Sequence, residues 1–164
     1  MLKTIPLIFI LLFQSTLVNA QIVRVTSLEF PPYTSDSLKN KGWAWEVANK
    51  SFKEVGINST LTIFPWGRAL KLVEEGKYDA LYIANKTKER QRWAYFSDPV
   101  GEEVTVLFGL NSRGLKEENL KNYKIGILRG GVPSMIIQLK SPESSFYELT
   151  SFEQGIKMLL KKRI

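Results

Sequence analysis

The chain has 164 residues, of which 44% are hydrophobic and 24% are charged, a composition typical of a globular protein with one or two domains. It contains no cysteine and no histidine, which excludes a disulfide framework, a thiol nucleophile, a histidine-based triad and the usual zinc sites. The net charge is +7, from 23 Lys and Arg against 16 Asp and Glu, but the basic residues are scattered among acids. We therefore expect a solvated basic surface that attracts anionic ligands, and no nucleic-acid partner.

The first twenty residues have the pattern of a secretory signal peptide. Lys3 supplies the positive charge, residues 5–13 form an apolar run interrupted by Pro6, and the small Ala20 ends a cleavage site before Gln21. A membrane anchor is the alternative, but this run is too short for a bilayer core, which needs about 20 residues. No later segment is long and apolar enough to span a membrane, so we expect a soluble periplasmic protein released by cleavage.

The first half of the mature chain alternates between strand and helix patterns. Residues 22–30 alternate apolar and polar as a strand does, and residues 59–64 and 78–84 read as two further strands. Between them lie two helical patterns that end at Gly56 and Gly76. The apolar face of the first helix is expected to hold Ala44, Val47, Ala48, Phe52 and Val55, and that of the second Trp66, Ala69, Leu70 and Val73. This order predicts a parallel α/β sheet with right-handed crossovers.

The second half begins a new unit. Residues 102–110 read as an apolar strand, residues 124–131 as a strand with a Gly-rich turn, residues 132–139 as a helix and residues 145–151 as a strand. Ser151 and Gln154 fit a capping box for a last helix. We expect a first α/β lobe over residues 21–109 and a partial second lobe over residues 110–164.

Thr87 and Arg90 lie three residues apart just after the third predicted strand. In open α/β sheets, ligands gather outside the carboxyl ends of the strands. The position therefore favours a site for a small charged molecule over two solvated surface side chains.

Several segments together resemble a known family. They are "EFPPYT", "PWGRAL…EEGKYDAL", "TKERQRWAYFSDPV", "LKNYKIGILRGG" and "SFEQGIKMLLKKRI", in the family's order. The mature chain is similar to the amino-terminal two thirds of the family 3 extracellular solute-binding proteins, the amino-acid-binding receptors of ABC importers. The resemblance implies a type II periplasmic-binding-protein fold, with two α/β lobes of mostly parallel sheets that close on a solute. It also implies an incomplete second lobe, because the sequence halts at "KKRI", where the family continues.

The resemblance also implies site residues. Arg90 corresponds to the family's clamp for the ligand carboxylate, a role that suits a guanidinium because it offers two parallel donors. The other candidates are Thr87 and Asn85 for polar contacts, Tyr33 for a ring against the ligand, Trp66 and Arg68 at the start of the second helix, and Gly130 for backbone N–H groups ahead of a helix.

Each of these assignments has an alternative. Arg92 could replace Arg90, or Arg90 could pair with an acid such as Glu89 or Asp98. Trp66 could belong to the core, and the turn at Gly130 could be an ordinary turn. Asn85 departs from the family's small residue, so a carboxylate ligand without an α-amino group fits as well as an amino acid.

The leading hypothesis is a binding protein that captures a small polar or carboxylate-bearing solute for an ABC importer. Expected partners are that solute and a membrane permease, with the protein a monomer that uses no metal or cofactor. One alternative is a secreted prephenate-type dehydratase on the same fold, with Glu29 or Asp98 as the general acid. The other is a non-functional truncated fragment.

Overall fold

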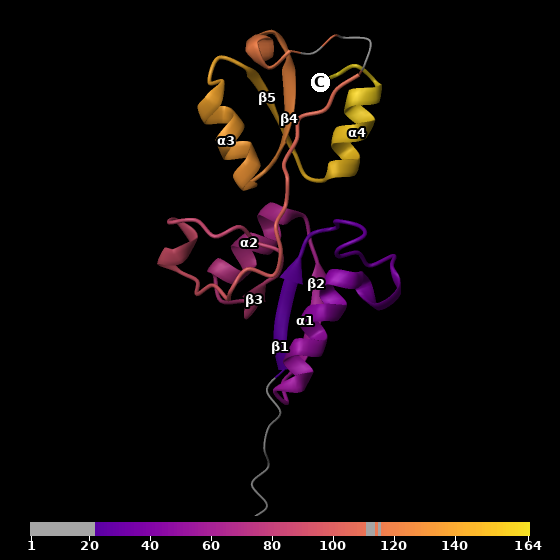
Figure 1. Cartoon of the computed structure of the whole chain (residues 1–164), viewed down its shortest axis with the longest axis vertical. Coiled ribbons are helices and arrows are strands. Elements are labelled where there is room, and N and C mark those ends of the chain that lie inside the picture. The colour runs from indigo at the N-terminus through magenta and orange to yellow at the C-terminus, as the bar shows by residue number, and fades with distance from the viewer. Residues whose placement is uncertain (1–21, 111–113, 115) are drawn as a thin grey trace, which may run out of the picture.

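Two α/β lobes make up the computed structural model, which describes residues 22–110, 114 and 116–164 (Figure 1). The predicted signal peptide lies outside these residues. The lower lobe in Figure 1 contains β1 (Ile22–Ser27), α1 (Trp43–Glu54), β2 (Asn58–Ile63), α2 (Trp66–Glu74) and β3 (Ala80–Leu81). The upper lobe contains β4 (Lys124–Leu128), α3 (Val132–Lys140), β5 (Ser145–Leu149) and α4 (Phe152–Leu160). Short 3₁₀ helices cover Lys39–Lys41, Arg90–Arg92 and Glu117–Asn122. None of the helices in these residues is long and apolar enough to cross a bilayer.

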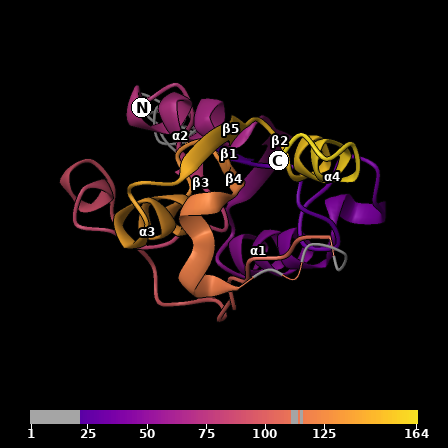
Figure 2. The same ribbon diagram turned by 90° about the horizontal axis from the view of Figure 1, so that it is seen from above.

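Both sheets are parallel, as the order of elements predicts. The lower sheet has the order β2-β1-β3, with β1 paired to β2 from Ile22 opposite Asn58 to Ser27 opposite Ile63. The upper sheet pairs β4 with β5. In both views α1 and α2 lie on opposite faces of the lower sheet, and α3 and α4 flank the upper one (Figures 1 and 2).

The core of the lower lobe lies between the sheet and α1. Val25, Trp45 and Leu61 are each at most 5% exposed, and Ala48 and Phe52 pack against them. The prediction for α1 was wrong at two positions, because Val47 and Val55 are 53% and 70% exposed. Trp45 occupies the central core position, so the face that it shares with Ala48 and Phe52 is buried and the two valines point away.

The third predicted strand is shorter than residues 78–84. Only Ala80–Leu81 pairs with β1, and Ile83 has a left-handed φ of +59°. A β-branched residue rarely adopts this conformation, which takes the chain out of the sheet. The turn directs the following residues, 85–90, away from the strand.

The strand predicted over residues 102–110 is absent. The described strands pair only within the two sheets, so this segment has no partner for its backbone N–H and C=O groups. Val104 and Phe108 are 89% and 69% exposed. An apolar, β-branched sequence is therefore not sufficient for a strand when no neighbouring strand lies beside it.

The predicted helix ends are confirmed. Gly56 and Gly76 follow α1 and α2 with φ of +74° and +69°, the left-handed conformation that glycine adopts without steric cost. The Ser151 hydroxyl accepts a hydrogen bond from the Gln154 backbone N–H at 3.1 Å, as a capping residue should.

An ion pair ties the start of β3 to β1. The Asp79 carboxylate accepts hydrogen bonds from the Arg24 backbone N–H at 2.8 Å, from Nε at 3.0 Å and from Nη2 at 2.8 Å. These bonds, the side-chain ones first, lower the pKa of Asp79 to about 2, and the same contact raises the pKa of Arg24. Both shifts agree in sign, so the pair stabilises the folded chain while Asp79 is ionised.

We predict that Asp79→Asn reduces the acid sensitivity of folding. The depressed pKa of Asp79 contributes stability that is present above its ordinary pKa of 3.8 and is lost as the pH falls through about 2. Urea unfolding midpoints at pH 5 and pH 2.5 should therefore differ less in the variant than in the wild type. Arg24→Leu is the matched control, because it removes the partner and should reduce the difference equally. An undiminished difference in both variants would contradict the role of the pair.

Candidate functional site

The candidate site lies at the carboxyl edge of the lower sheet. The loop that contains Tyr33 follows β1, Trp66 begins α2 just after β2, and Arg90 lies in the segment that follows β3. Because the three strands are parallel, these segments emerge at the same edge. In Figure 1 this edge faces the upper lobe.

Arg90 is the centre of a cluster that spans both lobes. Its side chain is 5% exposed; Nη1 donates to the Asn85 carbonyl at 2.8 Å, and Nη2 donates to the Gly130 carbonyl of the upper lobe at 3.0 Å. The Thr87 hydroxyl accepts a hydrogen bond from the Arg90 backbone N–H at 3.1 Å. We call Arg90, Trp66, Asn85, Thr87 and Gly130 the Arg90 cluster.

Trp66 packs beneath the guanidinium. Cζ of Arg90 lies 5.4 Å from the centroid of the Trp66 ring, within the range of a cation–π contact. The indole Nε1 donates to the same Gly130 carbonyl at 3.0 Å, and the side chain is 5% exposed. Trp66 is thus buried, as expected if it belonged to the core. It is buried at the contact between the two lobes, however, and against Arg90, the predicted anion-binding side chain.

The Arg90 guanidinium has no carboxylate partner in the part of the chain that the structure describes, where no acid lies within 4.0 Å of it. Pairing with Glu89 or Asp98 is therefore not observed. Burial lowers the pKa of Arg90, while the charge of Glu89 raises it to a smaller extent. Since arginine stays protonated over the physiological range, the cluster holds a buried cation that two neutral carbonyls solvate.

Tyr33 belongs to a row of four aromatic rings that also reaches the upper lobe. The Tyr33 ring lies 4.9 Å from that of Phe30 and 5.3 Å from that of Trp43, and Phe30 lies 5.2 Å from Phe152 at the start of α4. Tyr33 is 38% exposed, so part of its ring remains available to a ligand. We call these four residues the aromatic row.

The position of Tyr33 is fixed by the start of α1. The Tyr33 carbonyl accepts from the Ala44 N–H at 3.2 Å, and the Pro32 carbonyl accepts from the Trp43 N–H at 3.3 Å. Gly42 permits this approach, because a Cβ there would lie 2.4 Å from the Tyr33 carbonyl oxygen. These N–H groups of α1 are occupied by the turn and are not open to an anion.

Arg68 and Gly130, which were also predicted as site residues, are placed differently from the other candidates. Arg68 is exposed and lies over the Phe64 ring, with Cζ 4.8 Å from the centroid, and among the described residues its side chain forms no hydrogen bond with the Arg90 cluster. Gly130 presents its carbonyl to the cluster, while the N–H of Gly131 donates to Leu128 at 3.0 Å. The role predicted for Gly130 as a donor of free N–H groups stays a prediction.

Two residues of this region were not predicted. Glu103 accepts a hydrogen bond from the Asn85 side-chain amide at 3.0 Å, and Phe152 closes the aromatic row. Both contacts join residues distant in sequence. No local pattern distinguishes Phe152 from any other apolar residue next to a helix cap.

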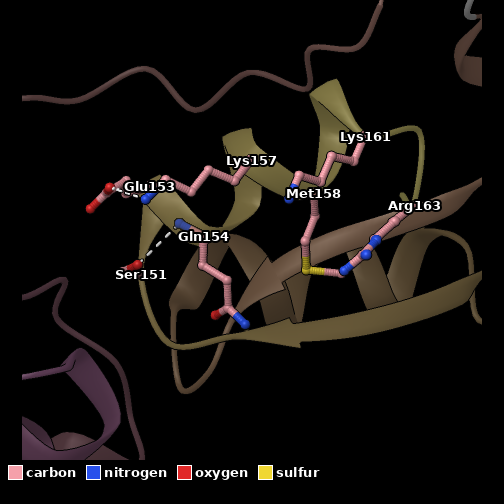
Figure 3. A pocket seen from close by; sticks show the side chains of 7 residues that line it. All are labelled: Ser151, Glu153, Gln154, Lys157, Met158, Lys161 and Arg163. Atoms are coloured by element: carbon pink, nitrogen blue, oxygen red, sulfur yellow. Dashed lines mark hydrogen bonds and ion pairs between the residues drawn. The ribbon is translucent and has the colours of Figure 1, made fainter.

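A hollow of about 400 Å³ runs along α4 (Figure 3). It is lined by Ser151, Glu153, Gln154, Lys157, Met158, Lys161 and Arg163. None of the predicted site residues lines it. Lys157 and Glu153 pair at 2.5 Å on its rim, so part of its positive charge is already neutralised. In the described ranges, no group of three or more acidic side chains could hold a metal ion.

Residues 22–162 match the family model of the bacterial extracellular solute-binding proteins, family 3. The chain belongs to this family. The match covers most of the sequence and confirms the resemblance drawn from its motifs. A search of curated proteins found no match.

Solved structures show that the fold of this solute-binding protein is the two-lobed one. An ancestral arginine-binding protein bound to arginine has 19% identity and a TM-score of 0.71, over 87% of this chain and 67% of the other. An arginine-specific periplasmic binding protein of Salmonella typhimurium has 20% identity and a TM-score of 0.71, over 88% and 67%. An ancestral amino acid-binding protein that is a precursor of cyclohexadienyl dehydratase has 17% identity and a TM-score of 0.73, over 87% and 67%. The chain thus spans about two thirds of their length.

We predict opposite effects for two glycine substitutions at the contact between the lobes. Gly130 has a φ of +71°, so Gly130→Ala should lower the free energy of unfolding by about 1–2 kcal/mol through backbone strain. Gly67 lies inside α2, and a Cβ there would lie 3.5 Å from Arg129 Cδ, an ordinary contact. Gly67→Ala should therefore be neutral or stabilising by up to about 1 kcal/mol. Urea unfolding of both variants measures this, and equal losses would show that the turn conformation is not the cause.

Proposed function

We propose that this protein captures a small carboxylate-bearing solute between its two lobes and delivers it to an ABC importer. The observation that supports it most is the buried Arg90 guanidinium, which has two neutral acceptors and no acid within 4.0 Å in the described residues. A carboxylate would supply the missing charge and accept two parallel hydrogen bonds from it.

The surroundings of Arg90 offer further contacts to a carboxylate-bearing ligand. The aromatic row offers the partly exposed face of Tyr33 at the same sheet edge, against which an apolar stem or a cation can pack for about 0.5–2 kcal/mol. Thr87 and Asn85 stand next to Arg90 as polar contacts. Proteins of the same fold bind arginine in two of the solved cases above, which supports an amino acid or a related organic anion as the solute.

Capture without chemical change is favoured over catalysis. Glu29 accepts a hydrogen bond from the Asp36 N–H at 3.2 Å and Asp98 is exposed, and neither contacts the Arg90 cluster. A general acid must lie within hydrogen-bond reach of the reacting group, and these two carboxylates lack that placement. The dehydratase precursor that shares the fold is itself an amino acid-binding protein.

The remaining parts of the proposal follow from the family. Its members are extracellular proteins, and a signal peptide over residues 1–20 would place this one in the periplasm after cleavage. A membrane permease is then the partner that receives the solute. The competing proposal of a non-functional fragment predicts that no solute binds.

We predict that Arg90→Lys abolishes the response to solute. Thermal unfolding of residues 21–164 is recorded with L-arginine, L-glutamine, L-glutamate and succinate. A solute that binds only the folded state adds about 2.7 kcal/mol at a hundredfold excess over its dissociation constant. The midpoint should rise in the wild type and not in Arg90→Lys, because an ammonium cannot form the parallel pair of bonds.

Arg92→Lys is the matched control, since Arg92 is exposed two residues away, and it should respond as the wild type does. A full response of Arg90→Lys would contradict the assignment of Arg90. If no compound raises the wild-type midpoint, binding of this class of solute is rejected.

A further inference from the structure

One backbone oxygen joins the two lobes at the Arg90 cluster. The Gly130 carbonyl accepts from Arg90 Nη2 and from Trp66 Nε1, both at 3.0 Å. Gly130 belongs to the turn between β4 and α3, whereas both donors belong to the lower lobe and are 5% exposed. The two bonds therefore hold one point of the upper lobe on two buried side chains of the lower one.

The contacts of Trp66 leave it little to offer a solute. Its ring lies against the Arg90 guanidinium, and its single polar atom is used by Gly130. A tryptophan has no other hydrogen-bonding group. Trp66 thus positions Gly130 and Arg90 relative to each other.

The Gly130 carbonyl is also a weaker partner for Arg90 than a carboxylate. It carries one oxygen and no net charge, whereas a carboxylate accepts two bonds and charge-assisted bonds are roughly twice as strong as neutral ones. The buried cation is therefore satisfied by a neutral group that an anion can replace.

We propose that Trp66 and Gly130 form a latch that holds the lobes together before solute binds. In this state the Gly130 carbonyl accepts the Arg90 hydrogen bond that a solute carboxylate oxygen would otherwise accept. Solute then exchanges its carboxylate for this carbonyl, a step that rests on the proposed function. Trp66 is a positioning residue in this mechanism, because it retains Gly130 and does not contact the solute.

Neighbouring contacts make the latch local to one side of the interface. A Cβ at Gly67 would lie 3.5 Å from Arg129 Cδ, next to the latch, and the aromatic row forms another contact between the lobes, with the Phe30 and Phe152 rings 5.2 Å apart. Loss of the latch should thus loosen the lobes without separating them.

The first test measures the distance between the lobes without solute. The chain has no cysteine, so nitroxide labels at Lys53→Cys on α1 and Leu139→Cys on α3, both exposed, report this distance by pulsed electron resonance. The wild type should give a narrow distribution at the distance in this structure. Trp66→Phe keeps the ring but removes the indole N–H, and should give a broader and longer distribution.

Two further variants complete this test. Trp45→Phe, the same substitution in the core between α1 and the lower sheet, is the matched control and should resemble the wild type. Arg90→Met removes the other donor to the Gly130 carbonyl and should loosen the lobes as Trp66→Phe does. If Trp66→Phe loses its near-ultraviolet circular dichroism, and therefore its tertiary packing, Arg90→Met decides the test. The latch is overturned if the wild type itself is broadly distributed, or if a folded donor variant is as narrow as the wild type.

The second test measures the affinity for L-arginine by calorimetry. Because the latch competes with the solute, Trp66→Phe should bind about two- to tenfold more tightly, the equivalent of one neutral hydrogen bond of about 0.5–1.5 kcal/mol. An affinity tenfold weaker, with Trp45→Phe unchanged, would mean that Trp66 contacts the solute and would overturn the exchange. If L-arginine does not bind the wild type, that part of the proposed function fails, while the distance measurement still decides the latch.

Discussion

The structure depends on a buried arginine charge that no acid balances among the residues that the structure describes. Arg90 is 5% exposed, and the groups around it are an indole ring and the carbonyls of Asn85 and Gly130. A buried cation is costly unless it is well solvated by the protein, so each of these groups must hold its position. The Gly130 carbonyl comes from the upper lobe, which means that solvating Arg90 and joining the lobes are one event. On the proposed function, the same requirement favours an anion as the ligand of Arg90.

The parallel sheet explains why this charge lies at the edge that faces the upper lobe. With β1 between β2 and β3, the segments that follow all three strands emerge at one edge, toward the upper lobe. The start of α1 is also near this edge, but its N–H groups already serve the Pro32 and Tyr33 carbonyls. On the proposed function, anion recognition is therefore assigned to a side chain. Arg90 has the planar geometry for it, and its backbone is fixed by the Thr87 hydroxyl.

The sequence predicted the features that are set by interactions within a few residues, such as the helix ends. Gly56, Gly76 and the Ser151 cap mark helix ends because their conformations and bonds are set within a few residues. The alternation of strands and helices likewise predicted the parallel sheet and placed Arg90 after its third strand. What sequence could not reveal depends on distant partners: the exposure of Val47 follows from the place of Trp45 in the core, and the acceptor that joins Trp66 to Arg90 belongs to a turn some forty positions from Arg90. The segment 102–110 has the sequence of a strand and lacks only a neighbour.

The Arg90 cluster and the exposed apolar surface of the chain are separate features of the structure. Arg90, Trp66 and Gly130 are joined by hydrogen bonds in a chain that spans two thirds of the length of its solved relatives. Several apolar side chains remain uncovered, since Val104, Phe108 and Leu139 are between 69% and 89% exposed. The upper sheet pairs β4 with β5 alone among the described strands. Two strands gain stability mainly from the helices packed on them. On the proposed function, the affinity for a solute therefore falls as the upper lobe holds Gly130 more firmly, because the solute carboxylate must displace the Gly130 carbonyl from Arg90.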